Sequence, residues 1–299
     1  MFRNLRFYHI SSPWPKTEEA LSEVLSENPF SSCGPYSERT AGWEAPADFD
    51  GAPLCRRLNG ADLLQLRTQS RVLPVAAVRE ALEEKLIEYR SRMEQDPPRS
   101  ELRRLKEETR DELLPKALLR SERSRACFIH AESLLVIDAG TDSKAEWFID
   151  QLRTCFGQFS CTPLAFNKMP GELLKRIFLG ENLLGFSLGR ECRMQDLSDS
   201  RSIVTWREFE LTDQSIRRHV IDGMKLTHLG IGFDQLLSCV MNEDGVISKF
   251  RFIEGEAIDT ADYEDPLARL DADFVLLTGT ISLMLEALKK LLGGCVLQD

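Results

Sequence analysis

Two aspartates separated by one residue, Asp271 and Asp273, have the spacing that best suits metal chemistry. In a β-strand, residues i and i+2 project from the same face, so both carboxylates could bind one divalent cation. Further acids upstream could add oxygen ligands: Asp259, Asp262, Glu264 and Asp265. Such a site would suit a metal-dependent nuclease or phosphoesterase. The simpler interpretation, which we favour, is a solvated acidic rim before a short buried strand over 273–278.

Other motifs that carry chemistry are missing from the sequence. It contains no G-x-x-x-x-G-K-[ST], G-x-G-x-x-G or G-x-S-x-G segment. The four histidines have no metal-binding spacing, so we interpret them as solvated or hydrogen-bonded side chains. None of the eight cysteines forms a C-x-x-C pair, which favours reduced thiols over a zinc ribbon or a disulfide framework.

Two groups of basic residues could contact phosphate. The first comprises Lys116, Arg120, Arg123 and Arg125, with Glu122 as the one acid among them. The second comprises Arg207, Arg217, Arg218 and Lys225. Arginine forks and helix surfaces suit phosphate oxygens. For Arg217 and Arg218, an exposed helix face without a ligand is an equally good interpretation.

The charge of the chain is unevenly distributed. The net charge is −10, which by itself argues weakly against a nucleic-acid partner. Residues 53–125, however, carry 17 basic and 13 acidic side chains, whereas residues 241–299 carry 5 and 12. Because fields are screened over about 8–10 Å, a local basic surface can bind phosphates on an acidic protein.

The first basic group lies at the end of a predicted helical arm. After Pro74, apolar residues at helical spacing predict one helix, which Asp96-Pro97-Pro98 ends. Ser100 would cap a second helix that ends near Pro115. This hairpin is too thin for a core of its own, so it is either a surface insertion or a dimerisation arm.

The remaining sequence predicts an α+β protein with mostly antiparallel sheets and flanking helices. We expect strands at 63–73 and 126–138 with Leu134–Ile137 buried, and a helix that starts at a capping box, Ser143 to Glu146, and ends at Gly157. In the second half, Thr212 would cap a helix, Asp244-Gly245 would form a hairpin turn, and Val246, Ser248, Phe250 and Phe252 would alternate along a strand. An acidic connection at 254–264, the strand at 273–278 and a helix at 280–292 would complete the chain.

Several stretches, in order along nearly the whole chain, resemble the recombination-associated protein RdgC family of bacteria. They are Phe2-Arg3-Asn4-Leu5 with Tyr8, Cys33-Gly34 with Gly42-Trp43, Leu73-Pro74 with Val78 and Ala81-Leu82, Leu113-Leu114-Pro115-Lys116-Ala117-Leu118-Leu119-Arg120, Val136-Ile137-Asp138, Lys144-Ala145-Glu146, Leu211-Thr212, and Asp271-Ala272-Asp273-Phe274 with Thr278-Gly279. This chain has Leu118 where the family has phenylalanine at a contact between subunits. It also has Arg207-Glu208-Phe209-Glu210 where the family tends to have lysines and a glutamine.

The resemblance implies a protein without enzymatic activity or cofactor that binds double-stranded DNA with little sequence preference. It implies a ring-shaped homodimer around the duplex and antagonism of RecA-mediated strand exchange. Leu114 and Leu118 would then contribute to the dimer interface. The DNA-binding residues would be Lys116, Arg120, Arg123, Arg207, Arg217, Arg218 and Lys225.

We expect three domains: a central α+β domain (1–74 plus 121–165), a helical arm or tip (75–120) and an α+β base (166–299). No membrane span or signal peptide is predicted, so we expect a cytoplasmic protein. The resemblance further implies association with the nucleoid, and we expect no bound metal. Two alternatives remain open. One is the metal-dependent nuclease at Asp271 and Asp273, and the other is a protein-interaction scaffold without DNA affinity.

Overall fold

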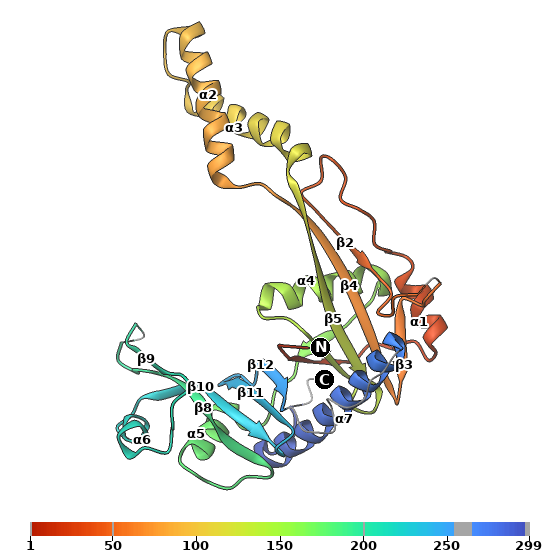
Figure 1. Cartoon of the computed structure of the whole chain (residues 1–299), viewed down its shortest axis with the longest axis vertical. Helices are drawn as coiled ribbons and strands as arrows, with labels where there is room; N and C mark the ends of the chain where they lie inside the picture. The colour runs from red at the N-terminus through yellow and green to blue at the C-terminus, as the bar shows by residue number, and fades with distance from the viewer. Residues whose placement is uncertain (1, 50, 200, 254–264, 297–299) are drawn as a thin grey trace.

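The structure is a computed structural model that describes residues 2–49, 51–199, 201–253 and 265–296. Figure 1 shows a horseshoe, in which a long arm rises from the body and leans over a base, leaving a concave side between them. Two antiparallel sheets with flanking helices confirm the predicted α+β class with a protruding helical hairpin. None of the described helices combines the length and apolar character needed to cross a membrane.

The central sheet has the strand order β2-β4-β5-β6-β1-β7, with β3 paired to β4. Its strands are β1 (Arg6–Ile10), β2 (Arg39–Trp43), β3 (Cys55–Leu58), β4 (Ala61–Val72), β5 (Leu118–Ile129), β6 (Leu134–Ile137) and β7 (Cys161–Pro163). Helices α1 (Glu18–Leu25) and α4 (Asp142–Phe156) pack on one face, around Trp43 and Phe148. Strand β6 is buried throughout, as predicted, because Leu135 and Ile137 face this core while Leu134 and Val136 face the other.

A long two-stranded stalk carries the arm. Strands β4 and β5 pair without interruption from Ala61↔Ile129 to Val72↔Leu118. The sequence placed the start of the second strand near residue 126, which is wrong by eight residues. The outer half of β5 is polar and exposed, so it has no buried periodicity and becomes a strand because β4 supplies its hydrogen-bond partners.

The arm contains the two predicted helices, α2 (Val75–Met93) and α3 (Arg99–Leu113), followed by the short turn η1 (Leu114–Lys116). The helices meet around Tyr89 and Leu105, and Lys85 forms an ion pair with Glu112 at 2.8 Å. Ser100 is not the cap of α3, because the helix already starts at Arg99 and Pro98 supplies no side-chain cap. Proline still fixes this boundary, since its preset φ suits the residue that precedes the first turn.

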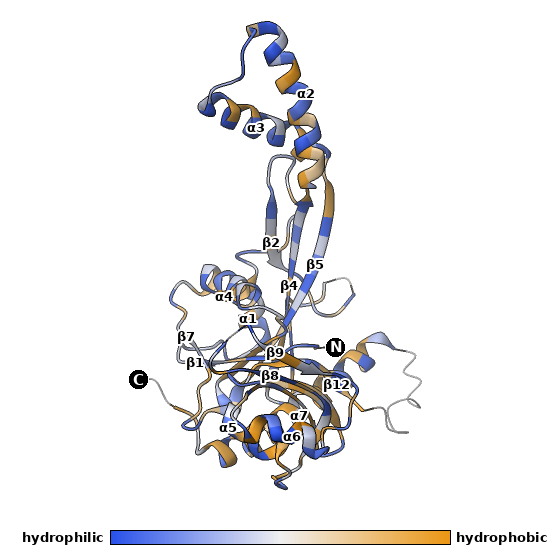
Figure 2. Cartoon of the chain, turned by 90° about the vertical axis from the view of Figure 1, so that its left-hand side faces the viewer, coloured by the Kyte–Doolittle hydropathy of each residue, from blue (hydrophilic) through white to orange (hydrophobic). Residues whose placement is uncertain are grey.

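The base sheet has the order β12-β11-β10-β8-β9. Its strands are β8 (Phe186–Gln195), β9 (Ile203–Trp206), β10 (Lys225–Phe233), β11 (Leu237–Asn242) and β12 (Ile247–Phe252). Helices α5 (Pro170–Phe178), α6 (Gln214–Ile221) and α7 (Pro266–Leu292) lie beneath it, as Figure 2 shows. The predicted hairpin turn at Asp244-Gly245 is confirmed, with Gly245 at φ +84° between β11 and β12.

The predicted strand at 273–278 is wrong, because these residues belong to α7. The buried residues of this 27-residue helix recur every three or four positions, including Phe274, Leu277, Ile281 and Met284. A short apolar run does not distinguish a strand from a buried helix segment. The predicted acidic connection at 254–264 lies outside the described residues.

Three local predictions differ from the structure. Thr141 caps α4, in place of Ser143, and Asp213 caps α6, in place of Thr212. In β12 the register with β11 shifts at a bulge where Lys249 adopts φ +52°. The bulge changes the predicted alternation, so Ile247 and Phe250 are the buried residues of this strand. Gly157 ends α4 as predicted.

The N-terminal strand joins the two sheets. Leu5 exchanges backbone hydrogen bonds with Ile247 of β12, and β1 then continues along β6 and β7. One hydrophobic cluster accordingly contains Phe2 and Leu5 together with residues of β8, β10 and α7. The base therefore packs on the central sheet through a shared core, and the division of the chain into three domains stays a prediction.

Candidate nucleic-acid interface

The base sheet has one covered face and one open face. Cys192 and Met194 of β8 and Leu226 and Leu229 of β10 are buried against the helices beneath the sheet. Arg193 lies between Cys192 and Met194 in β8. Because successive side chains of a strand alternate, Arg193 projects from the opposite, open face of the sheet. This open face lies above α5–α7 and faces the arm, so it forms the floor of the concave side (Figure 2).

Basic side chains from three segments gather on this floor. Arg190 and Arg193 come from β8, Arg207 follows β9, and Lys249 and Arg251 come from β12. Arg190, Lys249 and Arg251 line a hollow of about 340 Å³ together with Glu191, Glu208 and Ser238. We call these five cations the floor cluster. The arrangement offers several guanidinium groups to phosphate oxygens on one surface.

The floor cluster is only partly neutralised. Glu191 accepts from Lys249, with an Nζ–Oε2 distance of 2.5 Å, and lies 3.7 Å from Nε of Arg207. Arg251 donates to the Ser238 hydroxyl at 2.8 Å and Arg190 donates to the Glu208 carbonyl at 3.2 Å. Within the described part of the chain, Arg190, Arg193 and Arg251 have no ion-pair partner. Their positive charge is therefore available to an external anion.

The predicted basic residues of the arm root project from two different faces of the stalk. Arg120 projects from the same face of β5 as Glu122, which pairs with Lys144 of α4 at 2.5 Å, so Arg120 lies on the α4 side of the stalk. Arg120 and Lys116 are exposed and form no ion pair with any described residue. Both cations are therefore available to an external anion at the root of the arm.

Arg123 projects from the other face of β5, where it is already neutralised. Its Nε lies 2.6 Å from Oε2 of Glu44, and Arg67 donates to Oε1 of the same carboxylate at 2.9 Å. Burial opposes ionisation of Glu44, but these two hydrogen bonds hold the pKa of Glu44 below its ordinary value. Arg123 therefore has less unpaired charge to offer than Arg120.

The basic residues of α6 do not join the floor cluster. His219 of α6 packs against Trp206 of β9. Trp206 pairs with Cys192, which faces the helices, so α6 covers the same face of the sheet as α5 and α7. Arg218 lies 3.6 Å from Asp222, and Arg217 is half-buried with an Nε that has no hydrogen-bond partner among the described atoms. Lys225 forms an ion pair with Glu243 at 2.5 Å.

The two leucines predicted at the dimer interface have opposite environments. Leu118 is 79 % exposed at the start of β5, whereas Leu114 is only 5 % exposed. Val72, which pairs with Leu118 in the register, is also exposed, as are Val75 and Leu119. We call these exposed side chains the apolar surface at the root of the arm. Only Leu118 is therefore placed to contact a second molecule directly.

The acidic pair no longer has the geometry that suggested a metal site. On α7, residues two apart point about 200° apart, so Asp271 and Asp273 do not share a face. Both oxygens of Asp271 are also occupied by Arg56, at 3.1 and 2.6 Å. Asp259, Asp262 and Glu264 lie outside the described residues. Within the described ranges, no three His, Cys, Asp or Glu residues are grouped so that they could bind one metal ion.

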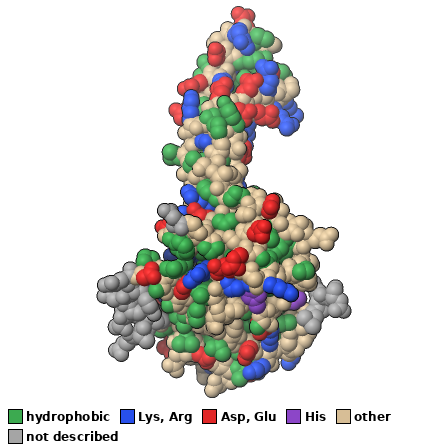
Figure 3. All heavy atoms as spheres, turned by 90° about the vertical axis from the view of Figure 1, so that its right-hand side faces the viewer, with side chains coloured by type: hydrophobic (Ala, Val, Ile, Leu, Met, Phe, Trp, Pro, Cys, Tyr) green, Lys and Arg blue, Asp and Glu red, His purple; other side chains and the backbone are tan. Residues whose placement is uncertain are grey.

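Four members of the floor cluster were missed by sequence reasoning, namely Arg190, Arg193, Lys249 and Arg251. They are spread over two strands that are about 60 residues apart, and each strand also carries apolar and acidic residues. The alternation Cys192, Arg193, Met194 could have identified one of them. On the convex side, by contrast, Lys and Arg side chains lie next to Asp and Glu side chains (Figure 3).

Comparison with known proteins gives matches over the whole chain. A family model described as "RdgC: Putative exonuclease, RdgC" matches residues 1–295. The recombination-associated protein RdgC of Aeromonas hydrophila is 31% identical over 297 residues, which cover 98% of each chain. The protein of the same name from Tolumonas auensis is 30% identical over 297 residues, again 98% of each chain. That of Shewanella oneidensis is 27% identical over 296 residues, 98% of this chain and 97% of that protein.

Proposed function

Since this chain belongs to the RdgC family and its relatives are named recombination-associated proteins, we propose that it binds double-stranded DNA without sequence preference as a ring-shaped dimer. In this proposal the duplex passes through the space enclosed by two horseshoes. By occupying duplex DNA, the dimer antagonises RecA-mediated strand exchange and is associated with the nucleoid.

The observation that carries this proposal is the floor cluster on the concave side. Five cations and the two acids Glu191 and Glu208 lie around one open sheet face of a chain whose net charge is −10. Lys116 and Arg120 add two exposed cations at the stalk and arm root, without an ion-pair partner among the described residues. Contacts to phosphates alone give affinity without reading bases, which fits arginines and lysines that are spread along a curved surface.

The apolar surface at the arm root supports the dimer. Val72, Val75, Leu118 and Leu119 are exposed on a narrow stalk that has no covering element of its own. Exposed apolar side chains that gather in one region often mark interaction surfaces. Pairing of two arm roots in an isologous contact would close one side of the ring. Leu114, which is buried, would support this surface from within its own chain.

The test is fluorescence anisotropy with labelled duplexes of unrelated sequence over a range of salt concentrations. We expect equal affinities for the sequences and a log–log salt slope of about −0.9 for each phosphate neutralised. The double variant Arg190→Glu, Arg251→Glu should abolish binding at moderate salt. Lys175→Glu, on α5 at the opposite side of the sheet, is the matched control. Retained binding by the double variant would exclude the floor as the DNA surface.

The absence of enzymatic activity belongs to the same proposal and has its own test. The name of the family model contains the word exonuclease, so end-labelled single- and double-stranded DNA should be incubated with the protein in Mg²⁺ and in Mn²⁺. We expect intact DNA, because the proposed mechanism is occupation of the duplex. Metal-dependent shortening of the labelled DNA in several independently purified preparations would favour the exonuclease alternative.

A further inference from the structure

Arg125 is a half-buried arginine without a counter-ion. It lies on the face of β5 that points away from α4, next to Arg123. Its Nε donates to Oε1 of Gln65 at 2.8 Å, and no described carboxylate lies within ion-pair distance of its guanidinium. Burial, and then the charge of Arg123, lower the pKa of Arg125. A half-buried, unpaired cation is costly, so an anion that reached it would be stabilised.

The acids around Arg125 already have other partners. Asp138, whose charge acts on Arg125, accepts hydrogen bonds from the backbone N–H groups of Arg3 and Asn4 at 3.2 and 2.8 Å. The carboxylate of Glu44 already accepts hydrogen bonds from Arg67 at 2.9 Å and from Arg123 at 2.6 Å. One carboxylate thus balances two guanidinium groups, and Arg125 adds a third. These three arginines therefore carry more positive charge than Glu44 balances, and Arg125 is the one without a carboxylate partner among the described residues.

Arg125 borders a groove large enough for a small organic molecule. A hollow of about 670 Å³ lies between residues 44–49, Gln65, Arg123 and Arg125. An adjoining hollow of about 400 Å³ continues between residues 46–49, Arg125 and the first turn of α7. Ligand sites typically measure about 300–1,000 Å³. We call both hollows together the Arg125 groove.

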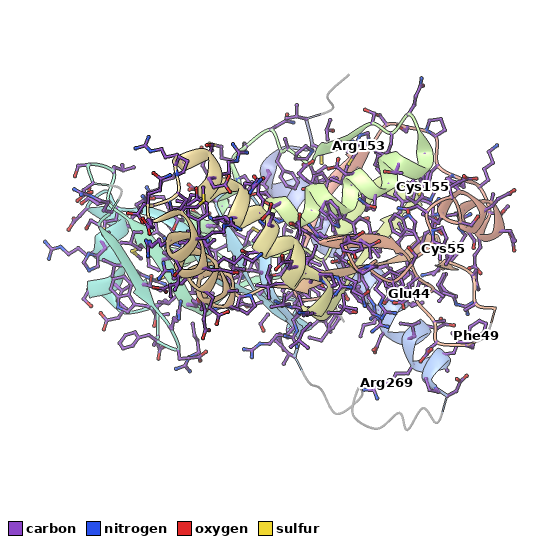
Figure 4. All side chains as sticks on the ribbon, turned by 90° about the horizontal axis from the view of Figure 1, so that it is seen from above. Glu44, Phe49, Cys55, Arg153, Cys155 and Arg269 are labelled. Carbon is purple, nitrogen blue, oxygen red and sulfur yellow. The ribbon has the colours of Figure 1, made fainter. Side chains whose placement is uncertain are left out.

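The groove has an aromatic wall and an acidic rim. Phe49 borders both hollows and is 49 % exposed. Asp48 lines both hollows and Asp265 lines the second. Figure 4 shows Glu44, Phe49 and Arg269 on one flank of the molecule, opposite Arg153 and Cys155 of α4. The groove therefore lies on the flank of the molecule opposite α4.

We propose that the Arg125 groove binds a nucleoside monophosphate, with the phosphate on Arg125 and the base against Phe49. A single unpaired guanidinium matches a single phosphate group. Stacking of a base on an aromatic ring contributes about 1–3 kcal/mol. Asp48 and Asp265 would accept hydrogen bonds from ribose hydroxyl or base amino groups. The same two carboxylates repel triphosphates and duplex DNA more strongly than a monophosphate, because these ligands carry more negative charge.

Isothermal titration calorimetry of the full chain with adenosine 5′-monophosphate tests the site. We expect binding of the monophosphate, at least tenfold weaker binding of adenosine and of adenosine 5′-triphosphate, and weak binding of inorganic phosphate. Arg125→Gln should weaken monophosphate binding at least tenfold, while Arg125→Lys should retain part of it. Phe49→Ala should weaken monophosphate binding without changing phosphate binding. Arg92→Gln, an exposed arginine of the arm, is the matched control and should behave as the unmodified chain.

Other measurements keep the result interpretable. Circular dichroism and the thermal midpoint show whether each variant folds, and Phe49→Ala and Arg125→Lys carry the test if Arg125→Gln does not. Duplex affinity by anisotropy should be unchanged in all variants, so failure of the ring proposal and failure of this one are distinguishable. The inference is overturned if the monophosphate does not bind, if the triphosphate binds more tightly, or if Arg125→Gln weakens duplex binding.

Discussion

Arg56 holds both carboxylate oxygens of Asp271, with Nε 3.1 Å from Oδ1 and Nη2 2.6 Å from Oδ2. Arg56 lies on β3 of the central sheet and Asp271 on α7 beneath the base, so the pair joins the two parts of the body. The side chains are 26 % and 25 % exposed, respectively. Hydrogen bonding to Asp271 raises the pKa of Arg56. The residue that looked like a metal ligand thus has a structural role.

This pair predicts a loss of stability in Asp271→Asn. The variant keeps the shape of the side chain but removes its charge, so we expect a decrease of about 1–2 kcal/mol in the free energy of unfolding. Urea unfolding followed by circular dichroism measures it. Asp273→Asn is the control, because Asp273 has no ion pair with any described residue, and it should change stability by less than about 0.5 kcal/mol. Equal effects of the two variants would contradict the role of the pair.

Arg120 and Arg123 should contribute unequally to DNA binding. Arg120 is unpaired on the α4 side of the stalk, whereas Glu44 neutralises Arg123 on the opposite face. We therefore expect Arg120→Ala to reduce the magnitude of the salt slope by about 0.9, and Arg123→Ala to leave it nearly unchanged. Anisotropy titrations at several salt concentrations give both slopes. A larger effect of Arg123→Ala would mean that the duplex lies on the other face of the stalk.

Leu118 and Leu114 should respond differently to substitution. Leu118→Asp places a charge on the exposed apolar surface of the arm root, so light scattering should report a shift from dimer to monomer with little change in monomer stability. Leu118→Phe should enlarge the apolar contact and strengthen the dimer. Leu114→Ala removes a buried side chain and should destabilise the arm by about 2–4 kcal/mol. An unchanged mass for Leu118→Asp would place the dimer contact elsewhere.

His228 should make stability depend on pH. Burial, and then the adjacent Arg193, lower the pKa of His228 below its ordinary value of 6.5, although Glu243, Glu191 and Asp244 act in the opposite direction. The unfolded chain therefore takes up the proton first as pH falls. Stability contributed by neutral His228 is complete above about pH 6.5 and decreases as pH falls through the lower folded pKa.

The check for His228 is the urea midpoint at pH 7.5 and at pH 5.5. His228→Gln keeps a polar side chain but cannot titrate, so its midpoint should fall less between the two pH values than that of the unmodified chain. Parallel decreases in the two proteins would assign the pH dependence to other groups.

The sequence by itself determined the arm, because its signals are local. Pro74, Pro97 and Pro98 limit two helices whatever surrounds them, since proline fixes φ and lacks an N–H. The same holds for the turn at Asp244-Gly245 and for the apolar run of β6, whose residues have few alternatives to burial. The resemblance of ordered short motifs to the RdgC family was likewise readable along the chain.

Tertiary structure alone decided the outer half of β5, the helical state of 273–278 and the composition of the candidate site. Residues 118–125 are polar and become a strand because β4 offers partners for their backbone groups. Residues 273–278 extend a helix because Phe274, Leu277 and Ile281 pack into the shared core at helical spacing. Whether a cation is available depends on which carboxylate lies within a few ångströms of it. That distance is set by the packing of strands far apart in the chain. Arg251 therefore has no carboxylate partner among the described residues, whereas Glu44 neutralises Arg123, and their sequence neighbours alone do not distinguish the two.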